Sequence, residues 1–371
     1  APTGCGTAQG LEYIGNGKLL AASTFGCSVI FSIDLNTQTA TTLLNPDGFL
    51  NDIKSLLFIP PSPTKSTLSF ACEDLGVNAV TLTVVDNNGN VSTCSANVTV
   101  SFSGVIPCTV TVSPQVLLQG PLLNPSAPGL MNDTLRVDGY LPVTSPYADA
   151  LMVDPNVFNL GGLSGTGLAN DDIVDWVWLE LRDSADNTDI TVSRSALIQR
   201  DGDVVDLDGT SEVTISAAPT DYYVVVNHRN HLGALSASTV GLTESPPTVV
   251  DFTDSGFATF GSDAQVTLSS GAKALWAGNV NGDITLQYAG AGVLETSDLL
   301  AFILNDGSNF LGLPTWPVPG YTNNDVDMNG VTQYAGAGVL DTPFILQNIL
   351  SYPGNFLGLS TWQIQEQLPE N

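Results

Sequence analysis

Oxygen-bearing side chains occupy alternate positions in two short stretches near the C-terminus. The later stretch, residues 325–330, reads Asp-Val-Asp-Met-Asn-Gly. A hard cation such as Ca2+ prefers six to eight oxygen ligands. Tight protein loops supply them from positions one, three and five, with glycine at position six to allow the turn. The pattern therefore predicts a Ca2+ site built on Asp325, Asp327 and Asn329.

The earlier stretch offers a related set of ligands. Its oxygen-bearing side chains stand at the same alternate positions, Asn279, Asn281 and Asp283. Ile284 occupies the place of the turn glycine, so we expect this turn to differ from the later one. For both stretches the alternative is an Asx-rich turn that binds no ion.

Neither stretch carries an acid at its twelfth position, where Gly290 and Gly336 stand. The nearest later acids are Glu295 and Asp341, at equivalent places. Either these two carboxylates close the sites from the following turn, or they cap the helices that follow. The sequence leaves both roles open.

The two stretches belong to a segment that occurs twice. The phrase Gln-Tyr-Ala-Gly-Ala-Gly-Val-Leu at 287–294 returns at 333–340, a shift of 46 residues. Such a period indicates one supersecondary unit used twice. Over about residues 275–365 the pattern resembles a dockerin type I module, which implies two Ca2+ loops that each precede a helix. The apolar positions Leu299-Leu300 and Ile345-Leu346 are then either an exposed docking face or the core between the helices.

The composition restricts the partners of the chain. It has 37 acidic and 9 basic residues, a net charge of -28. Nucleic acid and anionic membrane surfaces require clustered Lys and Arg, so neither is an expected partner. No apolar run reaches the roughly 18 residues of a membrane helix. Charged residues make up only 12% of the chain, and the abundance of Thr, Ser, Asn, Val and Gly is typical of all-β extracellular proteins.

All five cysteines lie within the first 108 residues. They form no C-x-x-C motif and have no histidine nearby, which favours disulfides over a zinc site. Their placement predicts the bridges Cys5–Cys27 and Cys72–Cys94. Cys108 is left over, either as a free thiol or as a cross-link to a neighbouring molecule.

The sequence divides into four regions. Residues 1–63 hold a few short strands, too few to close a core alone, so they either complete the next module or are completed by another chain. Residues 64–108 contain three expected strands, Leu68–Cys72, Ala79–Val85 and Val91–Val100, and the last two flank an Asn-Gly hairpin turn. They resemble the closing strands of hyalin-repeat, immunoglobulin-like modules. Residues 109–272 show strands at the spacing of a β-sandwich, and residues 273–371 hold the dockerin-like duplication.

A broader resemblance begins near residue 112. The phrases IVDWVWLELRDSAD and DYYVVVNHRNHLG, with others up to the C-terminus, resemble the C-terminal region of large secreted surface proteins of Bacteroidota. The resemblance implies export and an extracellular or cell-surface location, but no particular activity. The predicted fold is mainly β, with tandem Ig-like sandwich modules followed by a small dockerin-like module of two loop–helix repeats.

Other clusters of polar residues are weaker candidates for metal or catalytic sites. His228 and His231 are spaced for zinc, but no further ligand stands nearby, so we favour hydrogen bonds to backbone groups. The acids between Asp201 and Asp208 are either a second kind of Ca2+ site or a solvated turn. No G-x-S-x-G motif appears. We therefore predict that the chain is not an enzyme.

The triplets that begin at Asp133 and Asp183 match a short O-glycosylation signal used by Bacteroidota. They predict glycans on Thr134 and Ser184, both in loops or at loop edges.

Three functions remain. The first is an extracellular structural or adhesive protein, stabilised by Ca2+ and disulfides, that self-associates into a filament or surface layer by strand addition, with glycans or other cell-surface proteins as further partners. The second is a set of accessory modules of a secreted carbohydrate-active enzyme or protease. The third is a docking protein for a cohesin-type partner. The scarcity of catalytic residue types favours the first.

Overall fold

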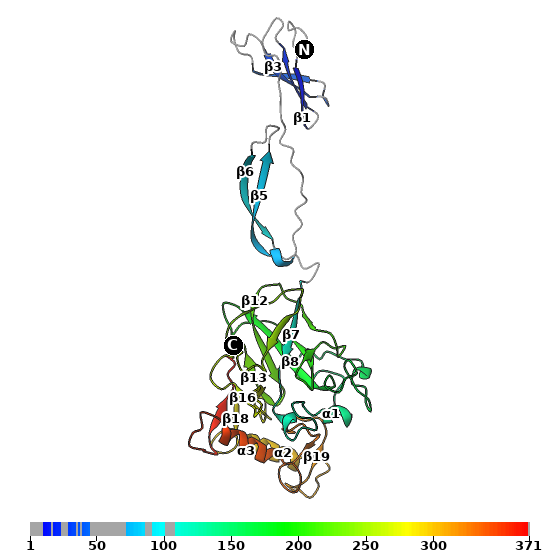
Figure 1. Cartoon of the computed structure of the whole chain (residues 1–371), viewed down its shortest axis with the longest axis vertical. Coiled ribbons are helices and arrows are strands. Elements are labelled where there is room, and N and C mark those ends of the chain that lie inside the picture. Colours follow the sequence, from blue (N-terminus) through cyan, green and yellow to red (C-terminus); the bar gives the residue numbers. More distant parts are fainter. Residues whose placement is uncertain are drawn as a thin grey trace. The chain divides into compact units, whose positions relative to one another are not determined.

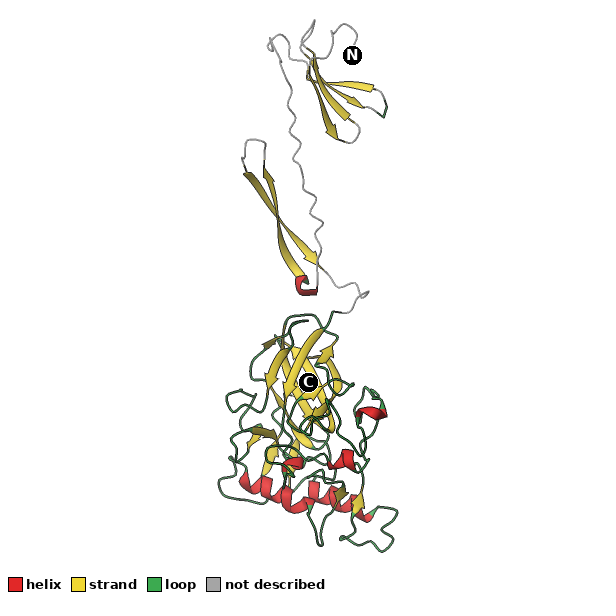
Figure 2. Cartoon of the chain, turned by 45° about the vertical axis from the view of Figure 1, so that its right-hand side comes forward, coloured by secondary structure: helices red, strands yellow, loops and turns green. Residues whose placement is uncertain are grey.

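The computed structural model describes residues 10–15, 18–23, 29–34, 36–37, 39–44, 72–85, 91–100 and 108–369. The chain divides into two compact units, residues 1–102 and 103–371, and each is described by itself. Strands far outnumber helices in both units (Figures 1 and 2). The predicted fold class, mainly β, is confirmed at this level.

The first unit contains a four-stranded antiparallel meander. Its strands are β1 (Gly10–Gly15), β2 (Lys18–Ser23), β3 (Val29–Asp34) and β4 (Thr39–Leu44). At the end of β3 the Asp34 carboxylate accepts hydrogen bonds from the backbone N–H groups of Asn36 and Thr37. A short acidic side chain of this kind stabilises the turn into the next strand.

The second feature of this unit is a long hairpin. Strands β5 (Gly76–Val85) and β6 (Val91–Val100) pair antiparallel from Gly76–Val100 to Val85–Val91. The register brackets the Asn-Gly turn predicted from the sequence, whose residues 86–90 lie outside the described set. Most side chains of β6 are exposed.

The predicted Cys72–Cys94 bridge is wrong, and so is an unpaired Cys108. Cys94 is a free, exposed cysteine, whereas Cys72 and Cys108 are each disulfide-bonded. Cys72 lies in the short helix η1 (Cys72–Asp74), before the first hairpin pair. Cys94 pairs with Leu82, six positions further along the ladder. Six strand positions span roughly 20 Å, far beyond the reach of a disulfide. Cys5 and Cys27 lie outside the described residues.

Two larger sheets form the body of the second unit. The first has the order β10-β9-β8-β12-β13, with β14 also paired to β12, and the second has the order β11-β7-β15. Within the second, β15 runs parallel to β7. The bounds are β7 (Val110–Gln115), β8 (Ile173–Asp183), β9 (Ile190–Gln199), β10 (Val204–Val205), β11 (Val213–Ile215), β12 (Asp221–His228), β13 (His231–Leu235), β14 (Val240–Gly241) and β15 (Thr248–Asp251).

Both sheets contribute to one hydrophobic core. Val110 and Val112 of β7 pack in the same cluster as Trp176 of β8, whose ring is fully buried. The indole Nε1 of Trp176 donates a hydrogen bond of 2.9 Å to the carbonyl of Pro142. Nearly every residue of β8 is buried, because this strand is central in its sheet. Strand β8 is therefore buried on both of its faces, although its apolar residues alternate in the sequence.

Smaller elements complete the unit, and its two longer helices lie at one end (Figures 1 and 2). The helices are α1 (Thr134–Val137), α2 (Glu295–Leu304) and α3 (Asp341–Ser351), with short helices η2 (Gly120–Leu122) and η3 (Pro155–Val157). The two-stranded ladders are β16 (Gln265–Thr267) with β17 (Lys273–Leu275), β18 (Thr285–Gln287) with β21 (Gln363–Gln365), and β19 (Val318–Pro319) with β20 (Val331–Thr332). None of the described helices has the length and apolar character of a bilayer span.

A second hydrophobic cluster holds the two repeats together. Leu299 of α2 and Ile345 of α3 are fully buried in it and belong to the core, whereas their neighbours Leu300 and Leu346 are only half-buried. Leu232 of β13 and Trp276 belong to the same cluster. The predicted boundary near residue 272 therefore lies inside one compact unit.

Candidate metal centre

Three carboxylates converge at the second repeat's loop. Asp325, Asp327 and Asp341 are all buried, and one oxygen of each lies within 4.8 Å of the others. The first two come from the loop before β20, and the third is the first residue of α3. The structure thus brings together two of the predicted loop ligands and the later acid.

The loop backbone explains why these side chains point inward. Met328 and Gly330 have left-handed conformations, with φ of 57° and 88°. The tight turn directs the N–H of Asn329 to Asp325 Oδ1 at 3.1 Å and the N–H of Gly330 to Asp325 Oδ2 at 2.8 Å. The Asn329 amide donates to Asp327 Oδ2 at 2.9 Å, so its own oxygen faces Val331, whose N–H it accepts at 2.9 Å.

Asp341 closes the site rather than capping its helix. Its two oxygens accept the N–H groups of Val326 at 2.6 Å and Gln333 at 2.7 Å, both outside α3. The helix N-cap, Leu340, makes no side-chain cap bond. Asp341 therefore links the start of the helix to both flanks of the loop, and the positive end of the helix favours its charge.

Burial makes the three charges costly when no cation is present. Desolvation raises the pKa of Asp325 to about 7, and the neighbouring charge of Asp327 adds to the effect. Desolvation also raises the pKa of Asp327. The pKa of Asp341 lies well above its ordinary value because of burial and then the charge of Asp325. A divalent cation would remove the repulsion that burial intensifies.

The first loop has the same outline with fewer charges. Gly282 adopts a φ of 71°, the conformation that Met328 adopts at the equivalent fourth position. The turn difference predicted from Ile284 is seen at the sixth position, where Gly330 has no left-handed counterpart in the first loop. Asn279 accepts the N–H of Gly282 at 3.1 Å and donates to the carbonyl of Asp283 at 2.8 Å.

The acids of the first loop are Asp283 and Glu295. Asp283 accepts hydrogen bonds from Thr285 and, at 3.1 Å, from the amide of Asn281. Glu295 is fully buried, and its Oε2 accepts the N–H of Gln287 at 2.6 Å, as Asp341 does from Gln333. Glu295 Oε1 has no hydrogen-bond partner. Burial raises the pKa of Glu295 to about 8.

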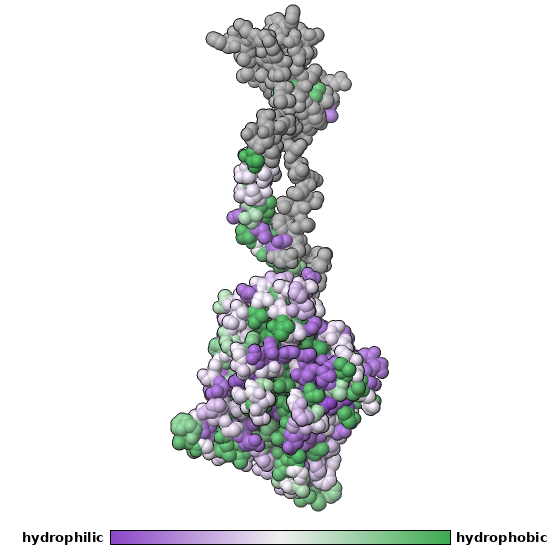
Figure 3. Space-filling view, viewed as in Figure 1, coloured by the Kyte–Doolittle hydropathy of each residue, from purple (hydrophilic) through white to green (hydrophobic). Residues whose placement is uncertain are grey.

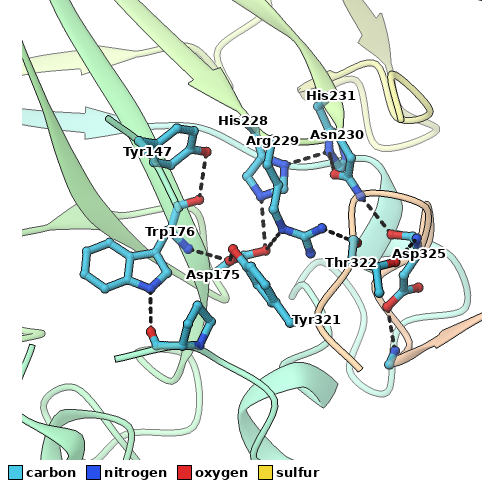
Figure 4. A network of polar contacts seen from close by, with 12 residues as sticks. Tyr147, Asp175, Trp176, His228, Arg229, Asn230, His231, Tyr321, Thr322 and Asp325 are labelled. Atoms are coloured by element: carbon cyan, nitrogen blue, oxygen red, sulfur yellow. Dashed lines mark hydrogen bonds and ion pairs between the residues drawn. The ribbon is translucent and has the colours of Figure 1, made fainter. Parts of the chain in front are cut away.

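A buried polar network, absent from the sequence prediction, anchors the second loop (Figure 4). Asp175 Oδ2 pairs with Arg229 Nε at 3.0 Å and with His228 Nε2 at 3.2 Å, and Asp175 Oδ1 accepts from the Tyr321 hydroxyl at 2.7 Å. The Arg229 guanidinium lies 4.1 Å from the centre of the Tyr321 ring and donates to the Thr322 carbonyl.

The same network reaches Asp325, a candidate metal ligand, directly. The amide of Asn230 donates to the Asp325 carbonyl at 2.7 Å. Residues 321, 322 and 325 are thus held by the β12–β13 turn. The available sequence signal was Asp175 itself, a charged residue inside the apolar run Ile173–Trp178, since a charge in a buried strand requires a partner.

The remaining predicted residues have ordinary roles. His231 Nε2 accepts the N–H of Gly120 at 3.1 Å, in line with the predicted bonding of the histidines to backbone groups. His228 is instead paired with Asp175, and desolvation lowers its pKa. Among the residues that the structure describes, the acids between Asp201 and Asp208 do not converge on one point. Asp206 pairs with Arg194, and Asp203 accepts from Gln115.

The two predicted glycosylation positions differ in access. Ser184 is exposed in the turn after β8, whereas Thr134 is partly buried as the first residue of α1. The glycans stay a prediction.

The comparisons with known proteins add no relative. No protein-family model, no curated protein and no solved structure matches this chain.

Proposed function

We propose that this protein is a non-enzymatic extracellular structural or adhesive subunit that self-associates, with its C-terminal repeats stabilised by Ca2+. The observation that supports the proposal best is the convergence of Asp325, Asp327 and Asp341. Three buried acids within 4.8 Å of one another are a poor way to stabilise a fold by themselves. They are the ligand type that Ca2+ prefers.

The ion would act on more than its own loop. Asp341 belongs to α3, Asp325 to the loop, and Asn230 ties that loop to the β12–β13 turn. A cation held by these residues would therefore stabilise the repeats and the sheets together. This is the behaviour expected of a structural ion in an extracellular protein, where Ca2+ is abundant.

Two further observations support a structural role. The pair that most resembles catalytic machinery is Asp175 with His228. Both side chains are fully buried, and Asp175 also forms an ion pair with Arg229, so no substrate reaches them. Disulfide-bonded Cys72 and Cys108 fit an oxidising, extracellular location. Together they favour the structural proposal over an enzyme.

The β-rich first unit supports self-association. A hairpin of two strands is marginally stable alone, and most side chains of β6 are exposed. Strand addition from another chain would complete such a sheet. In the same proposal, the second unit is a β-sandwich of the immunoglobulin type with a dockerin-like pair of loop–helix repeats.

The proposal is tested by calorimetric melting with Ca2+ and with a chelator, alongside sedimentation at high protein concentration. We expect Ca2+ to raise the melting temperature and to support assembly. Asp325→Asn should remove the thermal shift, while Asp189→Asn, at an exposed turn, should retain it. Identical melting curves with ion and with chelator would refute the Ca2+ site, and a purely monomeric protein would refute self-association.

A further inference from the structure

The two repeats expose matching apolar side chains. Phe310 and Phe356 are each 85% exposed, and the next residues, Leu311 and Leu357, are 67% and 68% exposed. Three more equivalent pairs are also exposed: Val293 and Val339, Leu304 and Leu350, and Leu313 and Leu359. Scattered exposed apolar residues are ordinary, but a set that recurs at equivalent places in both repeats indicates an interaction surface.

Each Phe-Leu pair sits on a rigid loop. Asn309 is buried, donates to the carbonyls of Ile303 and Leu313 at 2.8 and 2.9 Å, and accepts the N–H of Leu313 at 2.8 Å. Asn355 makes the same three bonds in the second repeat. The loop thus holds its apolar tip in solvent in a fixed conformation, which keeps the loss of conformational entropy on binding small. We name residues 310–311 and 356–357 the apolar tips.

A complementary surface lies on α3. Pro343, Leu346 and Leu350, with Gln347 and Ser351, line a hollow of about 380 Å3. A neighbouring hollow of about 340 Å3 shares Pro343 and Gln347. We name the pair of hollows the α3 groove. Figure 3 shows apolar surface at the end of the unit where Figure 1 places α2 and α3.

Charge distinguishes this groove from the rest of the molecule. The only acid of α3, Asp341, is buried in the metal centre. The equivalent face of α2 carries Asp298, which stands at the place of Phe344. Residues 307–317 and 352–365, which include both apolar tips, contain no charged residue. In a chain of net charge -28, these are surfaces on which two copies can meet without opposing acids.

We propose that an apolar tip of one copy inserts into the α3 groove of a second copy. Tip and groove are different surfaces of the same chain, so the contact is heterologous, and a heterologous contact that does not close propagates into a filament. This inference rests on the proposed self-association and names an interface for it in the second unit, besides the strand addition proposed for the first. A lipid surface is the less favoured occupant, because the net negative charge opposes approach to anionic membranes.

The test uses three variants of the full chain in Ca2+, compared by sedimentation velocity. Phe310→Asp combined with Phe356→Asp removes the tips, and Leu350→Asp removes the groove. Gln347→Glu places a charge in the groove at an exposed position with almost no change in shape. Met152→Asp is the control, since this side chain is 67% exposed outside the repeats. Each loss of an apolar contact should raise the dissociation constant about tenfold or more.

Mixing the tip-less and groove-less variants tests whether a tip binds a groove. Tip-less and groove-less chains should each assemble far less than the wild type, yet a mixture of the two should form small complexes that stop growing, because one chain supplies tips and the other a groove. Assembly of all variants like the wild type would overturn the inference and leave self-association intact. A wild type that stays monomeric would overturn both. Binding of the tips to neutral phosphatidylcholine vesicles, without assembly, would assign them to lipid instead.

Discussion

The two repeats share a backbone but differ in charge. Gly282 and Met328 adopt the same left-handed conformation, and Glu295 and Asp341 accept equivalent N–H groups. The second loop gathers three buried carboxylates, whereas in the first Asn279 hydrogen-bonds the backbone of its own loop. Amide side chains can form all their hydrogen bonds within their own loop, because they both donate and accept. Carboxylates only accept, so the second loop cannot satisfy its side chains in the same way.

Two positive charges could offset the carboxylates of the second loop. One is the proposed Ca2+, and the other is Arg229, whose charge opposes the rise in the pKa of Asp325. The first loop has no such cationic residue among its described contacts. The comparison therefore predicts that perturbations of the second repeat cost more stability than the same perturbations of the first.

The largest effect is expected for Arg229→Met. This change leaves Asp175 buried with its principal positive partner removed, and breaking a buried ion pair costs about 3–5 kcal/mol. Chemical denaturation should show this loss for the second unit. Arg229→Met with Asp175→Asn should recover part of it, because the uncompensated charge is gone. Equal losses in the single and double variants would contradict the ion-pair explanation.

The next effect is the loss of Ca2+ stabilisation in Asp325→Ala. At a hundredfold excess over its dissociation constant, a ligand adds about 2.7 kcal/mol to stability. Asp325→Ala should lose most of this increment, while Asn279→Ala should keep it. Titration calorimetry of both variants measures the difference. If Asn279→Ala abolished binding and Asp325→Ala did not, the assignment of the stronger site to the second loop would be wrong.

The third effect is a pH dependence in the presence of chelator. Asp325 and Glu295 have folded pKa values of about 7 and about 8, against about 3.9 and 4.3 for unperturbed Asp and Glu. The folded state thus binds more protons than the unfolded state, so stability should fall as pH rises from about 4 through 8. Asp325→Asn should flatten the part up to pH 7, and Glu295→Gln the part up to pH 8. Ca2+ should oppose the decline, because it binds the ionised form.

Much of this site was predictable because its ligands are close in sequence. The spacing of Asp325, Asp327 and Asn329 identified the loop, and the duplication drew attention to Asp341. Of these, Asn329 is the one that the structure assigns to holding Asp327 by hydrogen bond. The mainly β fold followed from composition and alternation.

What the sequence did not predict depends on distant pairings. Asp175, Arg229 and Tyr321 meet only because β8 pairs with β12 and the following turn contacts the second loop. No local spacing encodes that meeting. The cysteine error has a related cause, since the placement of the cysteines along the chain does not reveal that Cys94 lies six ladder positions from the hairpin's open end.

The smallest expected effect comes from making the first loop resemble the second. Asn281→Asp places a carboxylate at the position equivalent to Asp327, beside Asp283, whose charge contributes to the raised pKa of Glu295. A third acid should strengthen Ca2+ binding there, because affinity depends on ligand charge. With chelator the same change should lower stability by about 1 kcal/mol, since it also removes the Asn281 amide's hydrogen bond to Asp283.

Asn281→Ala is the matched control, because it loses the amide without adding charge. A gain in Ca2+ affinity for Asn281→Asp but not for Asn281→Ala would show that charge, rather than loop shape, separates the repeats. Equal affinities in the two variants would instead place the difference at Ile284, where the first loop lacks the turn glycine.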